Sequence, residues 1–228
     1  MSAPLLYVTG TNTGVGKTTL ACLLLRRARE RHIQLAAIKP FCSGGREDAE
    51  ELHSLQTTNL GIDEVNPFHF TEPIAPYVAA RNENRAITLQ KTIAAIKRIE
   101  PRNIPTLIEG AGGLLSPLGE KFTLLDIIHE LPGKICIVAP NTLGVINCAL
   151  LTHRALAKVS STRLHFILMN LSQHDASANS NASVIHDWTN VATLEFPFLS
   201  ETERGTRNSF TALIDGLLDW WIGNGKAA

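Results

Sequence analysis

Short apolar runs alternate along this chain with longer segments in which apolar residues recur at every third or fourth position. An uninterrupted run of about four to eight apolar residues is typical of a strand that is buried on both faces. Recurrence near 3.6 residues is typical of a helix with one buried face. The alternation therefore predicts an α/β fold, in which a mostly parallel β-sheet carries helices on both faces.

The same pattern sets the boundaries of the elements. Thr88 precedes an amphipathic segment and is a candidate N-cap, and the prolines of 66–76 indicate a loop. The predicted strands are 5–8, 35–38, 106–109, 135–139, 164–169 and 192–196. The predicted helices are 17–31, 46–60, 88–99, 144–158, 178–188 and 209–222.

Composition narrows the class of protein. The chain has 228 residues, 44% of them hydrophobic and 18% charged. These values fit a single packed domain over residues 1–228, with no repeat and no linker. The 21 Lys and Arg residues balance 21 Asp and Glu residues, so nothing attracts nucleic acid or an anionic membrane. No apolar run approaches the ~18 residues of a membrane span. We therefore expect small-molecule partners, with no nucleic acid and no membrane.

The cysteines indicate a reducing compartment. Cys22, Cys42, Cys136 and Cys148 form no C-x-x-C pair, so we expect free thiols and neither a disulfide framework nor a zinc site. The apolar run 5–8 is too short for a signal peptide and has no basic segment before it. We expect a cytoplasmic protein.

Residues 10–19, between the first predicted strand and the first predicted helix, read GTNTGVGKTT. Glycines let backbone N–H groups converge on phosphate oxygens, and a helix N-terminus adds a positive dipole end. Lys17 would bridge the β- and γ-phosphates, and the Thr18 hydroxyl would ligate magnesium. The usual motif has its first glycine at position 11, whereas here Gly10 comes one residue early. The segment predicts a P-loop NTPase fold that binds ATP and magnesium.

Polar residues follow two further predicted strands. Lys39 ends the second strand and would place a second cation beside the phosphate loop, and Ser43 lies in the turn after it. Glu109 ends the third strand, where the acidic residue of a Walker B element belongs. Asp48 lies near the start of the next helix, where a carboxylate is also common as a partner of the helix dipole. Magnesium prefers oxygen ligands, so Thr18, Asp48 and Glu109 are the candidate metal ligands.

These motifs occur together, in order, in one known family. The P-loop is followed by KPxxSG at 39–44, EPxxP at 72–76, EGAGG at 109–113 and LGxIN at 143–147. The chain closely resembles the dethiobiotin synthetases, and the resemblance runs from residue 5 to about residue 205. It implies an ATP-dependent, magnesium-dependent ligase of biotin biosynthesis that acts on 7,8-diaminopelargonate.

The resemblance also implies a reaction and a homodimer. CO₂ carbamylates one amine, the carbamate attacks the γ-phosphate of ATP, and the second amine closes a ureido ring as phosphate leaves the carbamic–phosphoric anhydride. The helix opening at 144–147 would hold the substrate carboxylate of the neighbouring subunit. Leu171 stands where some members carry Asp, so the preference among nucleotides stays open.

The implied site residues fall into overlapping groups. The catalytic group is Lys39, Lys17, Thr13 and Ser43. The metal ligands are Thr18, Asp48 and Glu109. The substrate-binding group is Ser43, Lys39, Gly144, Val145 and Asn147. The ATP-binding group is Gly14, Val15, Gly16, Lys17, Thr18, Thr19, Asp48, Glu109, Gly110, Ala111, Gly112, Asn170, Pro197, Phe198 and Leu199.

Two alternatives share the predicted fold. A nucleotide-switch ATPase of the partition type usually carries a lysine early in its P-loop, near position 12, where this chain has Asn12. An amidotransferase-type cobyrinate synthetase would carry an added glutaminase domain, for which 228 residues leave no room. Both fit less well than the synthetase.

Overall fold

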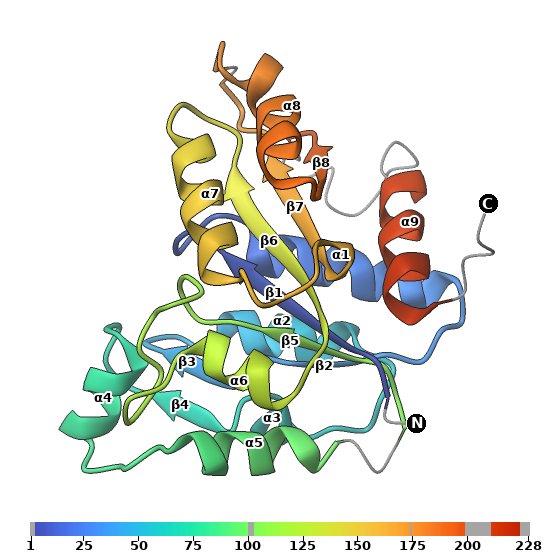
Figure 1. Ribbon diagram of the computed structural model, residues 1–228. Coiled ribbons are helices and arrows are strands. Elements are labelled where there is room, and N and C mark those ends of the chain that lie inside the picture. Colours follow the sequence, from blue (N-terminus) through green and yellow to red (C-terminus); the bar gives the residue numbers. More distant parts are fainter. Residues whose placement is uncertain (1–2, 100–102, 174, 199–210, 224–228) are drawn as a thin grey trace.

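The computed structural model describes residues 3–99, 103–173, 175–198 and 211–223. Its centre is a six-stranded sheet in the order β2-β5-β1-β6-β7-β8, and every neighbouring pair is parallel (Figure 1). The strands are β1 Leu5–Gly10, β2 Ala36–Ile38, β5 Thr106–Glu109, β6 Lys134–Pro140, β7 Leu164–Met169 and β8 Ala192–Phe196. The predicted parallel sheet is therefore confirmed.

Helices cover both faces of this sheet (Figure 1). They are α1 Lys17–Glu30, α2 Glu47–Leu55, α5 Leu89–Lys97, α6 Leu124–Glu130, α7 Val145–Ala155, α8 Ala178–Thr189 and α9 Thr211–Ile222, with the short α3 Ile62–Val65 and α4 Pro76–Asn82. Among them, α1 packs on α2 and α9, and α7 packs on α8. No helix in the described ranges is long and apolar enough to cross a membrane.

The strand residues are buried because both faces of the sheet are covered. Leu6, Tyr7 and Val8 of β1 have no exposed surface, and the apolar side of α1 packs above them through Leu20 and Leu24. Burying one such side chain stabilises the fold by about 1.5–3 kcal/mol. The Tyr7 hydroxyl still donates a hydrogen bond to the Leu131 carbonyl at 2.6 Å, so this buried polar group is satisfied.

Ion pairs fasten α9 to α1. Arg27 donates two hydrogen bonds of 2.8 Å to the carboxylate of Asp215, and Arg31 reaches Asp215 at 3.0 Å and Asp219 at 2.8 Å. The predicted helix 209–222 is present as α9, although residues 209–210 lie outside the described ranges.

A second, two-stranded parallel sheet lies beside the edge strand β2. It pairs β3 Phe41–Ser43 with β4 Phe68–Phe70, and the rings of Phe41 and Phe68 stack with centroids 5.0 Å apart. The prediction of a loop over 66–76 is wrong at β4, since three residues with phenylalanine at both ends suffice to pair. Pro76 opens α4 at a first-turn position, where proline loses no helical hydrogen bond.

The predicted helix 46–60 is wrong beyond Leu55. Gln56 turns to an extended conformation, and its side-chain oxygen accepts the N–H of Ala37 at 3.2 Å. The hydroxyl of Thr57 accepts the N–H of Leu35 at 3.1 Å. The chain leaves the helix because the donors at the edge of β2 need partners.

All six strands run in the same direction, so their carboxyl ends meet at one edge of the sheet. Gly10 ends β1, Glu109 ends β5 and Met169 ends β7, while Lys39 directly follows β2. Ligands of open parallel sheets bind at this edge.

Candidate functional site

The loop after β1 meets the sheet so closely that only glycine fits at two of its positions. A Cβ on Gly10, the last residue of β1, would lie 2.7 Å from Cγ2 of Val15, so a larger residue there would crowd the loop. Gly16 has φ of 98°, and a Cβ there would lie 3.1 Å from Cγ of Met169. No side chain caps the N-terminus of α1, so its first N–H groups remain available to an anion.

Lys17 is held within this loop. Its side chain is buried, and Nζ donates a hydrogen bond to the Asn12 carbonyl at 2.8 Å. Burial lowers the pKa of Lys17 to about 8, although the nearby Glu109 carboxylate acts in the opposite direction. An anion that replaced the carbonyl as the partner of Nζ would favour the charged form of Lys17.

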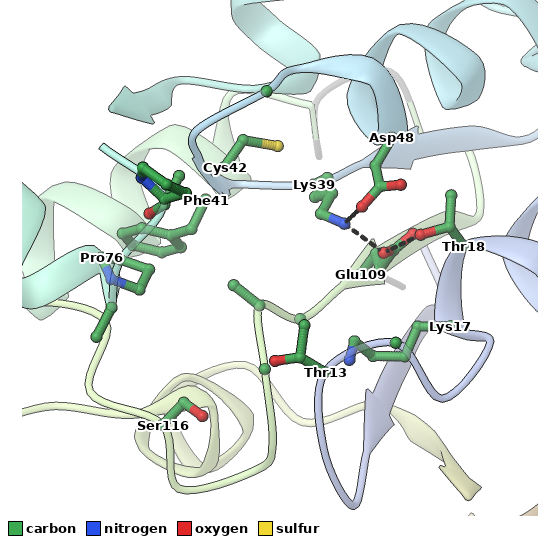
Figure 2. Close-up of a pocket in the computed structure, with 18 of the residues that line it drawn as sticks. Thr13, Lys17, Thr18, Lys39, Phe41, Cys42, Asp48, Pro76, Glu109 and Ser116 are labelled. Carbon is green, nitrogen blue, oxygen red and sulfur yellow. Dashed lines mark hydrogen bonds and ion pairs between the residues drawn. The ribbon is translucent and has the colours of Figure 1, made fainter. Parts of the chain in front are cut away.

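Four side chains from four segments meet opposite the loop (Figure 2). Oε1 of Glu109 accepts a hydrogen bond from the Thr18 hydroxyl at 2.7 Å and another from Nζ of Lys39 at 2.7 Å. Lys39 forms a second ion pair with Asp48. The side chain of Glu109 is fully buried and that of Lys39 is 9% exposed, whereas that of Asp48 is 52% exposed. The sequence predicted each of these residues, and the fold brings them into one cluster.

Burial and pairing shift the two buried charges. Burial alone would lower the pKa of Lys39, but Glu109 and Asp48 outweigh it and hold this pKa above its usual value. Burial raises the pKa of the Glu109 carboxyl, while the Lys39 charge and the Thr18 hydroxyl oppose that rise. Each charge therefore depends on its partner.

A cavity of about 690 Å³ opens between the loop and this cluster. The predicted residues that line it are Thr13, Gly14, Gly16, Lys17, Thr18, Thr19, Lys39, Ser43, Asp48, Glu109, Gly110, Ala111 and Gly112. The Ser43 hydroxyl is buried and has no hydrogen-bond partner in the described structure. An unpaired hydroxyl at a cavity wall is suited to a polar ligand.

The far wall of the cavity is apolar. It consists of Phe41 from β3, Pro76 from the start of α4, and Ile74, Ala75 and Pro117 from the neighbouring loops. Phe41 also packs on the ring of Phe122, with centroids 6.2 Å apart, so this wall rests on the core. The cavity can therefore take a ligand that is charged at one end and aliphatic along its length. Cys42 also faces it, but burial raises the pKa of this thiol to about 11, so it is not a ready nucleophile.

The candidate metal ligands offer oxygen atoms, the kind of ligand that magnesium prefers. Thr18 and Glu109 are in contact, and Asp48 joins them through Lys39. Oε2 of Glu109 is buried and has no hydrogen-bond partner among the described residues, so it is an open acceptor for a cation. The described residues contain no cluster of three or more His, Cys, Asp and Glu side chains that could hold a metal. A magnesium ion here would draw its other ligands from phosphate and water.

Several predicted residues lie outside this cavity. Val15 is buried in the core, so it can offer a ligand only its backbone. Asn170 follows β7, and Pro197 and Phe198 follow β8, at the same edge of the sheet. Gly144 caps α7, whose first turn holds Val145 and Asn147. Leu199 lies outside the described residues.

Two residues, Ser116 in the cavity wall and Asn141 beside Asn170, were not predicted from the sequence. The Ser116 hydroxyl accepts the N–H of Gly113 at 2.9 Å and thereby holds the loop after β5 against the cavity. Asn141 follows β6 and bonds to Asn170 at 2.7 Å. The position of Asn141, a polar residue directly after a buried strand, was a signal for it, whereas no comparable signal marks Ser116.

Comparisons with known proteins identify the family of the chain. A family model described as an AAA domain matches residues 5–201. An ATP-dependent dethiobiotin synthetase of Bacillus licheniformis is 40% identical over 169 residues, which are 72% of this chain and 72% of that protein. The enzyme of the same name from Akkermansia muciniphila is 32% identical over 199 residues, which are 87% of this chain and 91% of that protein.

A solved structure supports the fold. The chloroplast FtsY of Physcomitrella patens superposes with a TM-score of 0.51 at 17% identity, over 94% of this chain and 65% of that one. At this identity the likeness bears on the fold alone.

Proposed function

The chain belongs to the family of ATP-dependent dethiobiotin synthetases, and we propose on that basis that it converts 7,8-diaminopelargonate, CO₂ and ATP into dethiobiotin, ADP and phosphate. CO₂ adds to one substrate amine, and the resulting carbamate attacks the γ-phosphate of ATP, expels ADP and forms a carbamic–phosphoric anhydride. The second amine then attacks the carbamoyl carbon, closes the ureido ring and expels phosphate.

The observation that carries this proposal is the buried cation Lys39, which faces the P-loop cavity between two carboxylates. Carbamate and γ-phosphate are both anionic and repel each other on approach. Lys17 on one side and Lys39 on the other place two cations around the point where they would meet (Figure 2). Proteins catalyse phosphoryl transfer mainly by positioning the two reactants and by compensating their negative charge.

The remaining residues of the cavity would hold the reactants. The N–H groups at Gly14, Gly16 and the start of α1 would bind the phosphates. Thr18, Asp48 and Glu109 would hold magnesium, which screens the phosphate charge when bound. Thr13 and Ser43 add hydroxyl groups, and the unpaired Ser43 hydroxyl suits the amine or carbamate end of the substrate.

The apolar wall suits the aliphatic chain of 7,8-diaminopelargonate. Phe41, Ile74 and Pro76 offer hydrocarbon surface directly beside the charged end of the cavity. A polymethylene chain buried there gains about 0.8 kcal/mol for each CH₂ group that leaves water.

We further propose a homodimer in which α7 of each protomer faces the substrate of the other. Leu143, just before this helix, and Leu151, on it, are 83% and 60% exposed, and side chains of this size favour a covered position. Gly144, Val145 and Asn147 would then hold the substrate carboxylate at the N-terminus of the helix. The four free cysteines support a reducing compartment, and we propose the cytoplasm.

The test is the release of ADP by the purified protein with ATP and magnesium. We expect release to require both 7,8-diaminopelargonate and bicarbonate, and to disappear when either is left out. A steady release that is indifferent to the diamine would refute the proposal and would favour a nucleotide-switch ATPase. Lys158→Met serves as a control variant, because Lys158 is exposed and does not line the cavity.

A further inference from the structure

Three asparagine side chains form a hydrogen-bonded row at the carboxyl edge of the sheet. Nδ2 of Asn181, on α8, donates to Oδ1 of Asn141 at 2.9 Å. Nδ2 of Asn141 in turn donates to Oδ1 of Asn170 at 2.7 Å. Asn141 and Asn181 are only 2% and 1% exposed, so these amides form hydrogen bonds with each other in place of hydrogen bonds to water. Buried amides tolerate only arrangements in which each donor meets an acceptor.

The direction of this row is set by a group that cannot turn. Nδ2 of Asn181 also lies 3.4 Å from the backbone carbonyl of Thr142, which can only accept a hydrogen bond. The nitrogen of Asn181 must therefore face this side, and its neighbour Asn141 must present oxygen to it. Nδ2 of Asn141 then faces two oxygens, Oδ1 of Asn170 and, at 3.5 Å, Oε2 of Glu195.

The row determines which group Asn170 offers to a ligand. Its oxygen is turned toward Asn141, and no described residue accepts a hydrogen bond from its Nδ2. If the amide of Asn170 turned over, its N–H₂ group would meet that of Asn141, and two donors would face each other. The N–H of Asn170 is bonded to the Phe196 carbonyl at 2.8 Å, so the backbone is fixed as well.

Asn170 lies at the same edge of the sheet as the P-loop. It directly follows Met169, whose side chain packs against Gly16 of the loop. Leu171, the next residue, and Phe198, just after the neighbouring strand β8, are 48% and 47% exposed and offer apolar surface to a planar base.

We propose that Asn141 is a positioning residue, which fixes the amide orientation of Asn170 so that the site prefers a 6-aminopurine nucleotide to a 6-oxopurine nucleotide. This inference rests on the proposed function and takes Asn170, one of the ATP-binding residues that the family resemblance implies, as the residue that contacts the base of ATP. A carboxamide of fixed orientation places an acceptor beside a donor, which matches the amino group and N7 of adenine. Hypoxanthine carries an oxygen in place of the amino group, and this oxygen would face Oδ1 of Asn170.

The experiment compares ATP with ITP, whose bases differ in the group at C6 and in the proton that hypoxanthine carries on N1. KM for each nucleotide and kcat are measured with diamine and bicarbonate, and binding of each nucleotide is measured by calorimetry. In Asn141→Asp an acceptor replaces the donor that faces Asn170, so the Asn170 amide turns over. We expect the preference for ATP over ITP to fall by about tenfold, within the range of one bidentate base contact, through KM and with little change in kcat.

Two further variants make the result decisive. Asn190→Asp adds the same charge at an exposed residue after α8 and should keep the wild-type preference. Asn141→Ala frees the Asn170 amide without adding a charge, so it should also reduce the preference if Asn141→Asp fails to fold. An unchanged ATP-to-ITP ratio in a folded Asn141 variant would overturn the positioning role, as would a wild type that binds both nucleotides equally. A wild type that binds neither nucleotide would overturn the proposed function and this inference with it.

Discussion

Removing the charge of Lys39 tests the cluster at its centre. Lys39→Met keeps the aliphatic length and deletes the ammonium group, which leaves the Glu109 carboxylate buried without its cation. The two charges lie 2.7 Å apart, and their gross attraction at an effective dielectric constant of 20 is ~6 kcal/mol. Part of this attraction offsets the desolvation of both ions, and breaking such a pair by removing one partner costs about 3–5 kcal/mol.

The loss should depend on pH. Burial already raises the pKa of Glu109, and without Lys39 the opposing influence is lost, so this pKa rises further. A carboxyl group whose folded pKa is raised stabilises the fold below its unfolded pKa of about 4.3, and this contribution is lost as pH rises. Lys39→Met should therefore be less destabilised relative to wild type at pH 5 than at pH 8.

The assay is urea denaturation of a double-mutant cycle at both pH values. Glu109→Gln removes the unpaired charge, so the double variant should be more stable than Lys39→Met at pH 8, with a coupling energy of about 2 kcal/mol or more. Lys158→Met should behave as wild type. Additive effects of the two substitutions, or a loss of stability independent of pH, would show that the buried pair does not exist as described. Turnover should fall at least a hundredfold in Lys39→Met while nucleotide binding persists.

Three further predictions concern other parts of the molecule. Ser43→Ala removes a buried hydroxyl that has no partner among the described residues, so the stability of the fold should stay the same or rise slightly. Its kcat/KM for the diamine should fall by about tenfold to a hundredfold. A less stable variant with unchanged activity would contradict a contact between Ser43 and the ligand. Burial, aided by Lys134, lowers the pKa of His165 to about 4, so stability should decline as pH falls from about 6.5 toward 4, by about 1–2 kcal/mol after allowance for partial exposure. His165→Phe keeps an aromatic ring against Trp220 and should flatten that decline. An unchanged dependence of stability on pH would show that another group causes the decline. Asp215→Asn weakens both arginine contacts between α1 and α9 and should cost ~1 kcal/mol, a cost that salt reduces; thermal denaturation at low and high salt checks this, and a cost insensitive to salt would speak against ion pairing.

The sequence predicted the central sheet because its strands carry a strong local signal. The strands 106–109, 164–169 and 192–196 match β5, β7 and β8, and Thr88 caps α5 as expected, accepting the N–H of Lys91 at 3.3 Å. The elements that were not predicted from the sequence are short. α6 spans only Leu124–Glu130 and was not predicted, although Thr123 and Asp126 form a capping box at its start. β3 and β4 have three residues each and exist through their pairing, which no local pattern reveals.

The candidate site was predicted as a set of residues and not as a geometry. Parallel strands predict that Lys39 and Glu109 lie at one edge, but their shared contact with Thr18 and Asp48 depends on side-chain packing. The row of amides through Asn141 and Asn181 was not predicted, because it joins residues 40 positions apart. The proposed metal, substrate and dimer assignments stay predictions from the family resemblance.

The most direct test of the proposed function follows the carbon atom. Purified protein is incubated with ATP, magnesium, 7,8-diaminopelargonate and ¹³C-bicarbonate, and the product is analysed by mass spectrometry beside a count of ADP. We predict one ¹³C in the ureido ring of dethiobiotin for each ADP released, and none with Lys39→Met. Release of ADP without a labelled cyclic product would contradict the proposed synthesis of dethiobiotin.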